Sequence, residues 1–294
     1  MHELPPIVRV RADILGVEAG PGLAEIDARW LMAYAAGIGE ANPVYLDTSR
    51  KDGIVAHPVF PVCYEWPLAP ALRAKTIHPD VELMGVHATH DLLLHRLVVP
   101  GDRLTTTARI VGVEQRKPGA YVVTRYETRD ASGAPVTTTD YGTLYRGVET
   151  AGPDRWLIDA PADPHPADGP ARWHARVPIL AGAAHVYTEC ARIWNPVHTD
   201  RAVAAAAGLP DIILHGTATL ALAVSALLAR EADDDPTRVK RIRCRFAAMV
   251  LMPSTLTVQG LTREKAPDGE AVGFRVLTEQ GAPAIRDGLV ILHG

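Results

Sequence analysis

The second half of this chain repeats an ordered pattern of residues from its first half. Five residues recur 153 positions later: Tyr34, Asn42, Pro43, Val44 and Asp47 match Tyr187, Asn195, Pro196, Val197 and Asp200. Further matches follow in the same order, His57-Pro58 with His215-Gly216 and Gly133-Ala134-Pro135 with Gly281-Ala282-Pro283. Chance produces isolated matches, whereas an ordered series across half a chain indicates internal duplication. The chain is therefore predicted to contain two copies of one structural unit.

A proline-rich stretch separates the two copies. Five prolines fall within residues 151–170, and segments of this composition behave as stiff spacers. We predict a first domain over residues 1–150, a linker without regular structure over residues 151–170, and a second domain over residues 171–294. The length of 294 residues agrees with two domains of roughly 150 residues each.

Each copy shows the same order of predicted elements. Helices are expected over residues 27–39 and 62–75 in the first copy, and over residues 182–193, 202–207 and 217–230 in the second. Runs rich in Val, Thr, Ile and Tyr, separated by Gly and Pro turns, predict strands over residues 83–94, 102–114, 121–129, 136–146, 239–249, 255–262, 271–278 and 284–292. Helices followed by a strand meander predict an α+β fold, in which a helix packs on one face of an antiparallel sheet.

Composition and charge exclude several classes of protein. The formal net charge is −4, and no long run of Lys or Arg occurs, whereas nucleic-acid-binding domains show a basic balance or patch. The three cysteines (Cys63, Cys190 and Cys244) form no CxxC pair, so we interpret them as buried thiols in a reducing compartment. Aromatic residues make up only 5% of the chain, and a core of small aliphatic residues leaves room for a long, thin ligand.

No targeting or membrane segment is evident in the sequence. The first residues lack the basic and apolar regions of a secretory signal. The most apolar stretch, residues 214–229, includes His215, Thr217, Thr219 and Ser225, which favours a buried core helix over a membrane span. We therefore expect a cytoplasmic protein that binds neither nucleic acid nor membrane.

Two motifs of the second copy carry a family resemblance. Residues 195–200 read Asn-Pro-Val-His-Thr-Asp and are followed by His215-Gly216-Thr217. This pattern resembles the MaoC-like family of (R)-specific enoyl-CoA hydratases and dehydratases, and the first copy looks like the degenerate amino-terminal repeat of its two-domain members. The resemblance implies a double hotdog fold, in which each long helix is wrapped by a sheet and the halves pair about a pseudo-two-fold axis. It also implies a thioester of coenzyme A or of an acyl-carrier protein as substrate, no separate cofactor, and pairing as a homodimer or with a hotdog partner.

The resemblance assigns roles to three residues. Hydration of a 2-enoyl thioester needs acid–base groups for the water and the α-carbon, and hydrogen-bond donors for the thioester oxygen. In the family an Asp and a His five residues later do the acid–base work, and a glycine N–H meets the oxygen. On this chain His198 matches the catalytic His, Gly216 matches the oxyanion Gly, and Asn195 matches the residue that holds the turn.

The catalytic Asp of the family does not carry over. Its position, two residues before Asn195, is Ile193, whose side chain cannot move a proton. The first copy shows the opposite departure, because Glu40 stands at the Asp position while Tyr45 replaces the His. Glu189 lies one helical turn before Ile193 on the same predicted face, so it is a candidate replacement acid. The alternative for Glu189 is a solvated residue or one paired with Arg192.

The remaining candidates are weighed against structural roles. Substrate-binding candidates are Trp194, His215, Arg192, Tyr45 and Glu40. Trp194 packs either on the acyl chain or on the core; His215 is expected to order the helix start that presents Gly216. Arg192 and Arg245 could meet a phosphate of coenzyme A. We expect Asp200 to cap the helix over residues 202–207 and His57 to be structural.

Three histidines near residue 90 raise the question of a metal site. Strand alternation places His87 and His95 on one face and His90 on the other, which is poor geometry for ligands. We therefore predict no metal site.

Ile193 leaves three hypotheses open. The first is an (R)-specific hydratase or dehydratase of acyl thioesters with an atypical active site. The second keeps the thioester pocket but changes the reaction to that of an isomerase, a thioesterase or a cyclase acting on a polyketide-like acyl group. The third is a non-catalytic acyl-binding subunit of a hotdog complex.

Overall fold

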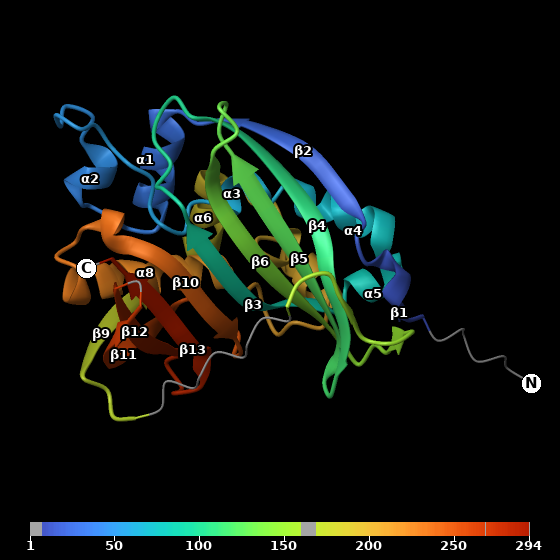
Figure 1. Ribbon diagram of the computed structural model, residues 1–294. Coiled ribbons are helices and arrows are strands. Elements are labelled where there is room, and N and C mark those ends of the chain that lie inside the picture. Colours follow the sequence, from blue (N-terminus) through green and yellow to red (C-terminus); the bar gives the residue numbers. More distant parts are fainter. Residues whose placement is uncertain (1–7, 160–168, 268, 294) are drawn as a thin grey trace, which may run out of the picture.

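One eleven-stranded sheet runs through both halves of the computed structural model (Figure 1), which describes residues 8–159, 169–267 and 269–293. Neighbouring strands of the first half are, in order, β2 (Glu18–Glu25), β4 (Arg103–Arg116), β5 (Gly119–Arg129), β6 (Pro135–Arg146) and β3 (Gly85–Leu94). The second half continues with β10 (Val239–Phe246), β13 (Pro283–Leu292), β12 (Gly269–Leu277), β11 (Ser254–Ala266) and β9 (Trp173–Ile179). The second order mirrors the first, so the predicted duplication is confirmed as a pseudo-two-fold arrangement.

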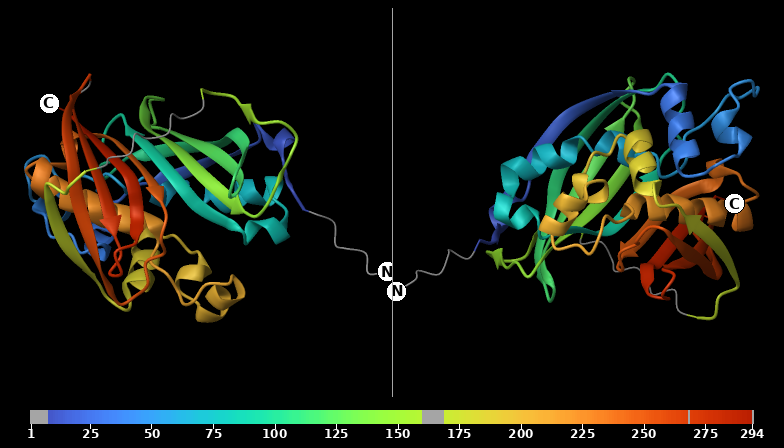
Figure 2. Two further views of the ribbon diagram at one scale, coloured as in Figure 1. Left: turned by 90° about the horizontal axis from the view of Figure 1, so that it is seen from below. Right: turned by 180° about the vertical axis from the view of Figure 1, so that it is seen from behind.

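The helices cover one face of this sheet, as the view from behind shows (Figure 2). Those of the first half are α1 (Ala28–Gly37), α2 (Pro43–Leu46), α3 (Val62–Glu65), α4 (Leu68–Thr76) and α5 (Pro79–Glu82), with the 3-10 turn η1 (Ala12–Ile14) before them. Those of the second half are α6 (Ala183–Ala191), η2 (Pro196–His198), α7 (Arg201–Ala206), α8 (Gly216–Glu231) and η3 (Pro236–Arg238). The main hydrophobic core is shared by both halves, so the predicted α+β class and double hotdog fold are confirmed.

The central helix is continuous in one copy and broken in the other. In the second half α8 buries an Ala- and Leu-rich face that includes Leu220, Ala221 and Leu228. The single helix expected over residues 62–75 is instead interrupted at Trp66 and Pro67. Proline lacks the N–H that would continue the hydrogen-bond ladder, and the chain resumes as α4.

The two strands at the edges of the sheet, β2 and β9, were not predicted from the sequence. β2 contains Pro21 and β9 contains Pro178, and β9 forms one end of the sheet while β2 forms the other. Proline cannot donate to a sheet ladder, so strands that contain it are confined to edges and read poorly as strands. The predicted meander therefore lacked one strand in each copy.

The proline-rich linker is partly ordered, contrary to the prediction. β7 (Thr150–Ala151) pairs with β1 (Val10–Arg11), and β8 (Arg155–Trp156) pairs with β4 as the eleventh strand of the main sheet. The indole of Trp156 lies where a side chain at Gly112 would otherwise stand. Residues 150–156 therefore belong to the first half, while the prediction for residues 160–168 lies outside the described residues.

The two halves meet between α1 and α6. A Cβ atom on Gly37 would lie 2.7 Å from the Cβ of Cys190, its counterpart in the repeat. The rings of Tyr34 and Tyr187, another equivalent pair, have centroids 5.8 Å apart. Equivalent residues that touch one another mark the pseudo-two-fold axis. Of the predicted buried thiols, Cys63 and Cys244 are buried and Cys190 is only partly so.

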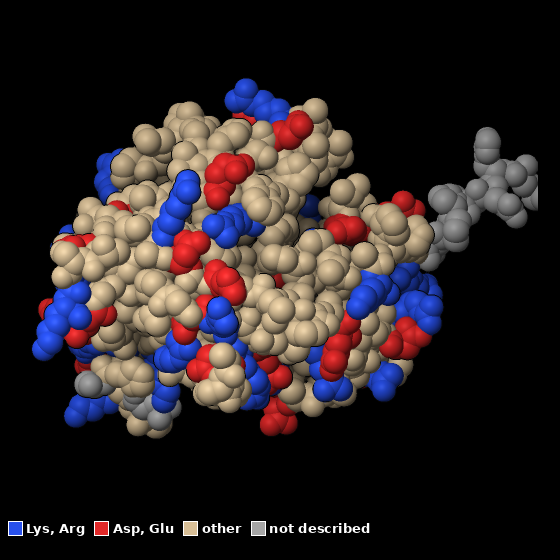
Figure 3. Space-filling model, turned by 90° about the horizontal axis from the view of Figure 1, so that it is seen from above, with Lys and Arg blue, Asp and Glu red and all other residues tan. Residues whose placement is uncertain are grey.

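The surface carries both signs of charge. Lys and Arg side chains alternate with Asp and Glu on the face seen from above (Figure 3), without a broad patch of one sign. No helix among the described residues has the length and hydropathy needed to cross a membrane.

Candidate active site

His198 is held as a neutral base. It ends η2, and its Nδ1 lies 2.8 Å from the carbonyl oxygen of Ile213. A carbonyl can only accept, so Nδ1 carries the proton and Nε2 keeps its lone pair. Burial lowers the pKa of His198 to about 4. The imidazole is therefore uncharged at neutral pH, with Nε2 available to accept a proton.

The turn that presents His198 is built from backbone contacts. The Asn195 carbonyl accepts from the His198 N–H at 3.2 Å, and the Asn195 side chain makes no capping hydrogen bond. In the first copy the matching Asn42 side chain does cap, accepting from the Val44 N–H at 2.9 Å. The first copy also has the equivalent backbone bond, from the Tyr45 N–H to the Asn42 carbonyl at 3.0 Å, so the two turns differ only in the side-chain cap.

His215 packs directly on His198. The two rings are stacked, with centroids 3.7 Å apart and an interplanar angle of 26°. The His215 Nε2 lies 3.2 Å from the Thr188 hydroxyl, and the residue is the N-cap of α8. The His215 side chain makes no capping hydrogen bond to α8, so its role in ordering the start of this helix stays a prediction.

Gly216 opens α8 beside the two histidines. The first N–H groups of an α-helix have no partner within the helix, so the Gly216 N–H is free to donate. A Cβ on Gly216 would lie 3.2 Å from the ring of Phe246. The Tyr187 hydroxyl donates to the hydroxyl of Thr217 at 3.0 Å, which ties α6 to this first turn.

No carboxylate accompanies His198. Ile193 is only 5% exposed, and no Asp or Glu lies within ion-pair distance of the His198 ring among residues 8–159, 169–267 and 269–293. Glu189 is exposed on α6. Asp200 accepts from the N–H groups of Ala202 and Val203 at 2.8 and 3.3 Å, which confirms its predicted role as the cap of α7.

In the first copy, buried side chains fill the position that corresponds to His198 and His215. Tyr45 is buried beside His57, with ring centroids 5.6 Å apart. The His57 Nδ1 accepts from the Val59 N–H at 3.2 Å, and its Nε2 lies 3.3 Å from the Ser225 hydroxyl of α8. Glu40 lies close enough to raise the pKa of Tyr45, though burial is the larger cause. His57 is thus structural, as predicted.

Arg192 and Trp194 flank the site at the surface. Trp194 is 62% exposed, so the interpretation that it packs in the core is wrong. The Arg192 guanidinium lies 4.0 Å over the ring of Trp30. Arg245 pairs with Asp287 at 3.5 Å.

The histidines of β3 do not alternate as predicted. A register shift between His87 and Thr89 interrupts the pairing with β6, and a bulge of this kind moves the following side chains to the opposite face. His87 and His90 therefore share a face, with ring centroids 5.4 Å apart. No group of three or more His, Cys, Asp or Glu residues suited to a metal ion is found within the part of the chain that the structure describes.

Both halves of the chain match models of known protein families. The MaoC like domain matches residues 167–277, and the FAS1-like dehydratase domain region matches residues 13–139. Each half of the chain therefore matches a dehydratase family model, and the second half matches the MaoC like domain. A solved MaoC-like dehydratase from Phytophthora capsici is similar in fold, with a TM-score of 0.82 at 23% identity over 94% of this chain and 95% of that one.

Two enzymes are similar in sequence to this MaoC-like chain. Enoyl-CoA hydratase ChsH3 of Mycobacterium tuberculosis is 27% identical over 95% of this chain and 96% of its own length. Peroxisomal multifunctional enzyme type 2 of Drosophila melanogaster is 30% identical over 64% of this chain, but the match spans only 31% of that protein. These relatives support an enzyme of the enoyl-CoA hydratase and dehydratase kind.

One group in the first half of this MaoC-like chain was not singled out from the sequence. Glu65 is buried in α3 and accepts from the Thr139 hydroxyl at 2.6 Å. Burial raises its pKa to about 8, so the carboxyl group is mostly protonated at neutral pH. The sequence offered one indication of a buried polar partner. The alternation Thr137-x-Thr139-x-Tyr141 along β6 places hydroxyl groups on the face towards the helices, because every second side chain of a strand faces the same way.

Proposed function

We propose that this protein adds water to 2-enoyl thioesters, or removes it from 3-hydroxyacyl thioesters, with His198 as the base and with (R) stereochemistry. The observation that carries the proposal is a neutral His198 whose Nε2 has no hydrogen-bond partner among the described residues, stacked on His215, the residue before Gly216 at the start of α8. The family of the chain and its hydratase relatives support the same reaction class.

The chemistry follows from these two groups. Nε2 of His198 takes a proton from water as its oxygen bonds to the β-carbon, and the double-bond electrons move toward the thioester carbonyl. The Gly216 N–H donates to the oxygen that gains negative charge, as an oxyanion donor does. The imidazolium then returns the proton to the α-carbon. Because burial lowers its pKa to about 4, the protonated ring is a stronger acid for this second step than an ordinary imidazolium.

His198 has no carboxylate partner among the residues that the structure describes, and this favours a second candidate reaction. A lone imidazole can move a proton between two carbons of an acyl thioester without adding water, which is the chemistry of an isomerase. Thioester hydrolysis, cyclisation and acyl binding without catalysis are further alternatives at the same site. Stable co-purification with a hotdog protein that carries the complete Asp and His pair would support the non-catalytic role.

An assay of product identity separates these reactions. The unmodified protein is incubated with 2-enoyl-CoA and 2-enoyl acyl-carrier-protein thioesters of several chain lengths, and products are separated by chiral chromatography. We expect (R)-3-hydroxyacyl thioesters. Double-bond isomers or free acids would replace the proposal with the second candidate.

The substitution Ile193→Asp tests whether the site lost only its acid. General acid–base groups contribute about 10²-fold or more to such reactions, so we expect hydration to rise at least tenfold. Ile193→Asn is the matched control, because it is polar but cannot transfer a proton. Equal rates for both variants would contradict the hypothesis that the site lost only its acid.

A further inference from the structure

Two neighbouring side chains of α6 hold the residues on either side of Gly216. The Thr188 hydroxyl lies 3.2 Å from Nε2 of His215, the residue before Gly216. The Tyr187 hydroxyl donates at 3.0 Å to the hydroxyl oxygen of Thr217, the residue after it. Tyr187 is 1% exposed, and its ring also packs on His215 with centroids 4.9 Å apart. The first turn of α8 is therefore fixed to α6 on both sides of the proposed oxyanion donor.

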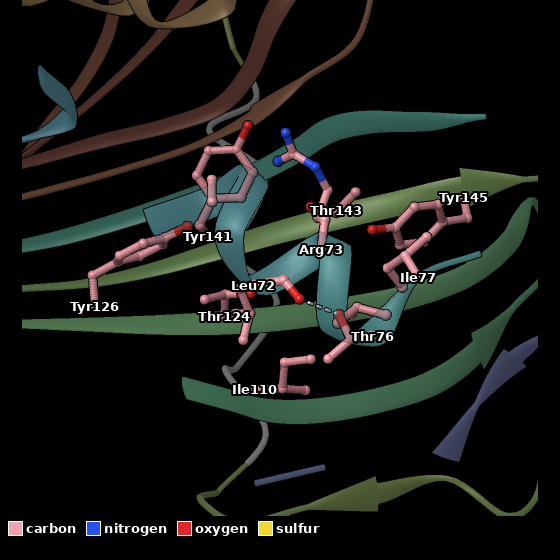
Figure 4. Close-up of a pocket in the computed structure, with 12 residues that line it drawn as sticks. Leu72, Arg73, Thr76, Ile77, Ile110, Thr124, Tyr126, Tyr141, Thr143 and Tyr145 are labelled. Carbon is pink, nitrogen blue, oxygen red and sulfur yellow. Dashed lines mark hydrogen bonds between the residues drawn. The ribbon is translucent and has the colours of Figure 1, made fainter. Parts of the chain in front are cut away.

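A threonine inside a helix can donate its hydroxyl hydrogen to the backbone carbonyl one turn earlier. Thr76 of α4 does so and reaches the Leu72 carbonyl at 2.8 Å, as the dashed line in Figure 4 shows. Thr219 of α8 makes the same contact with the His215 carbonyl at 3.2 Å. The Thr217 hydroxyl differs from both, because it accepts a hydrogen bond from the neighbouring helix α6 instead.

The hydrogen of the Thr217 hydroxyl has no acceptor among the described residues. A hydroxyl has one hydrogen to donate and two lone pairs, and the hydrogen bond from Tyr187 occupies one lone pair. The carbonyl one turn earlier belongs to Ile213, and its oxygen accepts from Nδ1 of His198 at 2.8 Å. Thr217 is partly exposed, like Gly216, whereas the next residues of α8 are buried. The Thr217 hydrogen is therefore available to a group that approaches the Gly216 N–H.

The first copy lacks both of these donors. In the repeat, Pro58 stands at the place of Gly216 and Val59 at the place of Thr217. Proline has no N–H and valine has no hydroxyl, so neither residue can donate to a thioester oxygen. The helix that follows them, α3, has 4 residues, whereas α8 has 16 and a long helix attracts negative charge to its N-terminus. The N–H, the hydroxyl and the long helix thus occur together in the copy that carries His198.

We propose that Thr217 is a second catalytic donor to the thioester oxygen, and that Tyr187 is the positioning residue that orients its hydroxyl. The inference rests on the proposed function, because the substrate carbonyl is taken to lie at the Gly216 N–H. Thr217 and Gly216 both donate a hydrogen bond as the oxygen gains negative charge, and no proton leaves Thr217. Tyr187 occupies a lone pair of the hydroxyl, so the hydrogen is directed away from α6.

Four variants test these roles in the hydration of crotonyl-CoA, a short 2-enoyl thioester. Thr217→Val keeps the shape of the side chain but removes the donor, so we expect kcat to fall about 10²-fold with little change in KM. Thr217→Ser retains a hydroxyl and should keep most of the rate. Tyr187→Phe should cause a smaller loss. The Tyr187→Phe, Thr217→Val double variant should match Thr217→Val alone, because Tyr187 acts only through Thr217, and additive losses would contradict this positioning role.

Two controls separate the loss of a donor from damage to the fold. Thr219→Val makes the same change two positions further along α8, where the hydroxyl bonds the helix backbone, and should leave kcat unchanged. The double variant removes both partners of the Tyr187 hydrogen bond, so no buried hydroxyl loses its partner, and urea unfolding should show that it stays folded. An equal loss of kcat in Thr219→Val and Thr217→Val would overturn the inference.

A measurement without turnover separates this inference from the proposed function. Butyryl-CoA has no double bond to hydrate, and infrared difference spectroscopy of an isotopically labelled carbonyl reports the hydrogen bonds to its oxygen. We expect the carbonyl band of the bound compound to move to higher frequency in Thr217→Val and to stay in place in Thr217→Ser. An unmoved band in Thr217→Val overturns the inference, and a failure to bind butyryl-CoA overturns the proposed function with it. A band that moves in a protein unable to hydrate crotonyl-CoA keeps the donor and rejects the hydratase.

Discussion

The residue at position 193 determines whether the second half has an acid to act together with His198. The sequence places Ile193 where the family resemblance expects an aspartate, and the structure buries it next to the turn of His198. The sequence predicts roles for His198 and Gly216 because their motif is local. It could not show that His198 stacks on His215, because that contact joins segments brought together only by the fold.

The pH dependence of the reaction reports on His198 directly. Its pKa is lowered to about 4, so the basic form of Nε2 dominates above that pH and is lost below it. We expect log kcat/KM for hydration to be flat from pH 8 to pH 6 and to fall only toward pH 4. A turn near pH 6.5, the ordinary value for histidine, would show that His198 is solvated or is not the base.

Glu65 should make the free energy of unfolding fall as the pH rises. Its pKa is about 8 in the folded chain and near 4.5 when unfolded, so the folded state holds a proton that the unfolded state loses in this window. The stabilising contribution of that proton is therefore present at low pH and declines as pH rises toward 8. Glu65→Gln, which keeps an acceptor for Thr139, should gain on the order of 1 kcal/mol per pH unit relative to the unmodified chain. Urea unfolding at pH 5 and pH 7 measures this difference, and an identical difference at both would contradict it.

At the scale of elements, the predictions succeeded where the pattern was local. The helix predicted over residues 27–39, which the structure shows as α1 (Ala28–Gly37), and the cap at Asp200 were predictable because capping residues and apolar spacing lie close in sequence. β2 and β9 were missed because proline masks an edge strand, and the bulge in β3 was missed because it depends on the pairing with β6. The break at Pro67 could have been predicted from its missing N–H.

The contact between α1 and α6 should be sensitive to one methyl group. A Cβ on Gly37 would lie 2.7 Å from the Cβ of Cys190, which is part of the backbone framework and cannot swing away. Gly37→Ala should therefore destabilise the protein by about 1–3 kcal/mol, although alanine is the better helix former. Urea unfolding of this variant, compared with the unmodified chain, measures the cost.

A second substitution serves as the control for this contact. Cys190→Gly removes the opposing Cβ, so the Gly37→Ala, Cys190→Gly double variant should be more stable than the two single effects predict when added. Strict additivity would show that the two helices do not press on one another at these residues.

The whole molecule is a duplication whose copies have specialised. The repeat predicted two units and their equivalence, and the mirrored strand orders follow from it. The repeat did not predict which copy holds an available base. In the first copy Tyr45 packs against His57, while in the second the Nε2 of His198 has no hydrogen-bond partner among the described residues. Which side chains fill a site depends on the packing of both halves around one shared core.

The central claim is that the second copy alone does the chemistry, through His198. The most direct measurement is kcat/KM for 2-enoyl-CoA hydration by two variants at equivalent positions, His198→Ala and Tyr45→Phe. The first should lose at least about 100-fold in rate, as expected when a general base is removed. The second should keep its rate, because the Tyr45 hydroxyl has no hydrogen-bond partner among the described residues. Undiminished hydration by His198→Ala, or an equal loss in both variants, would contradict the account.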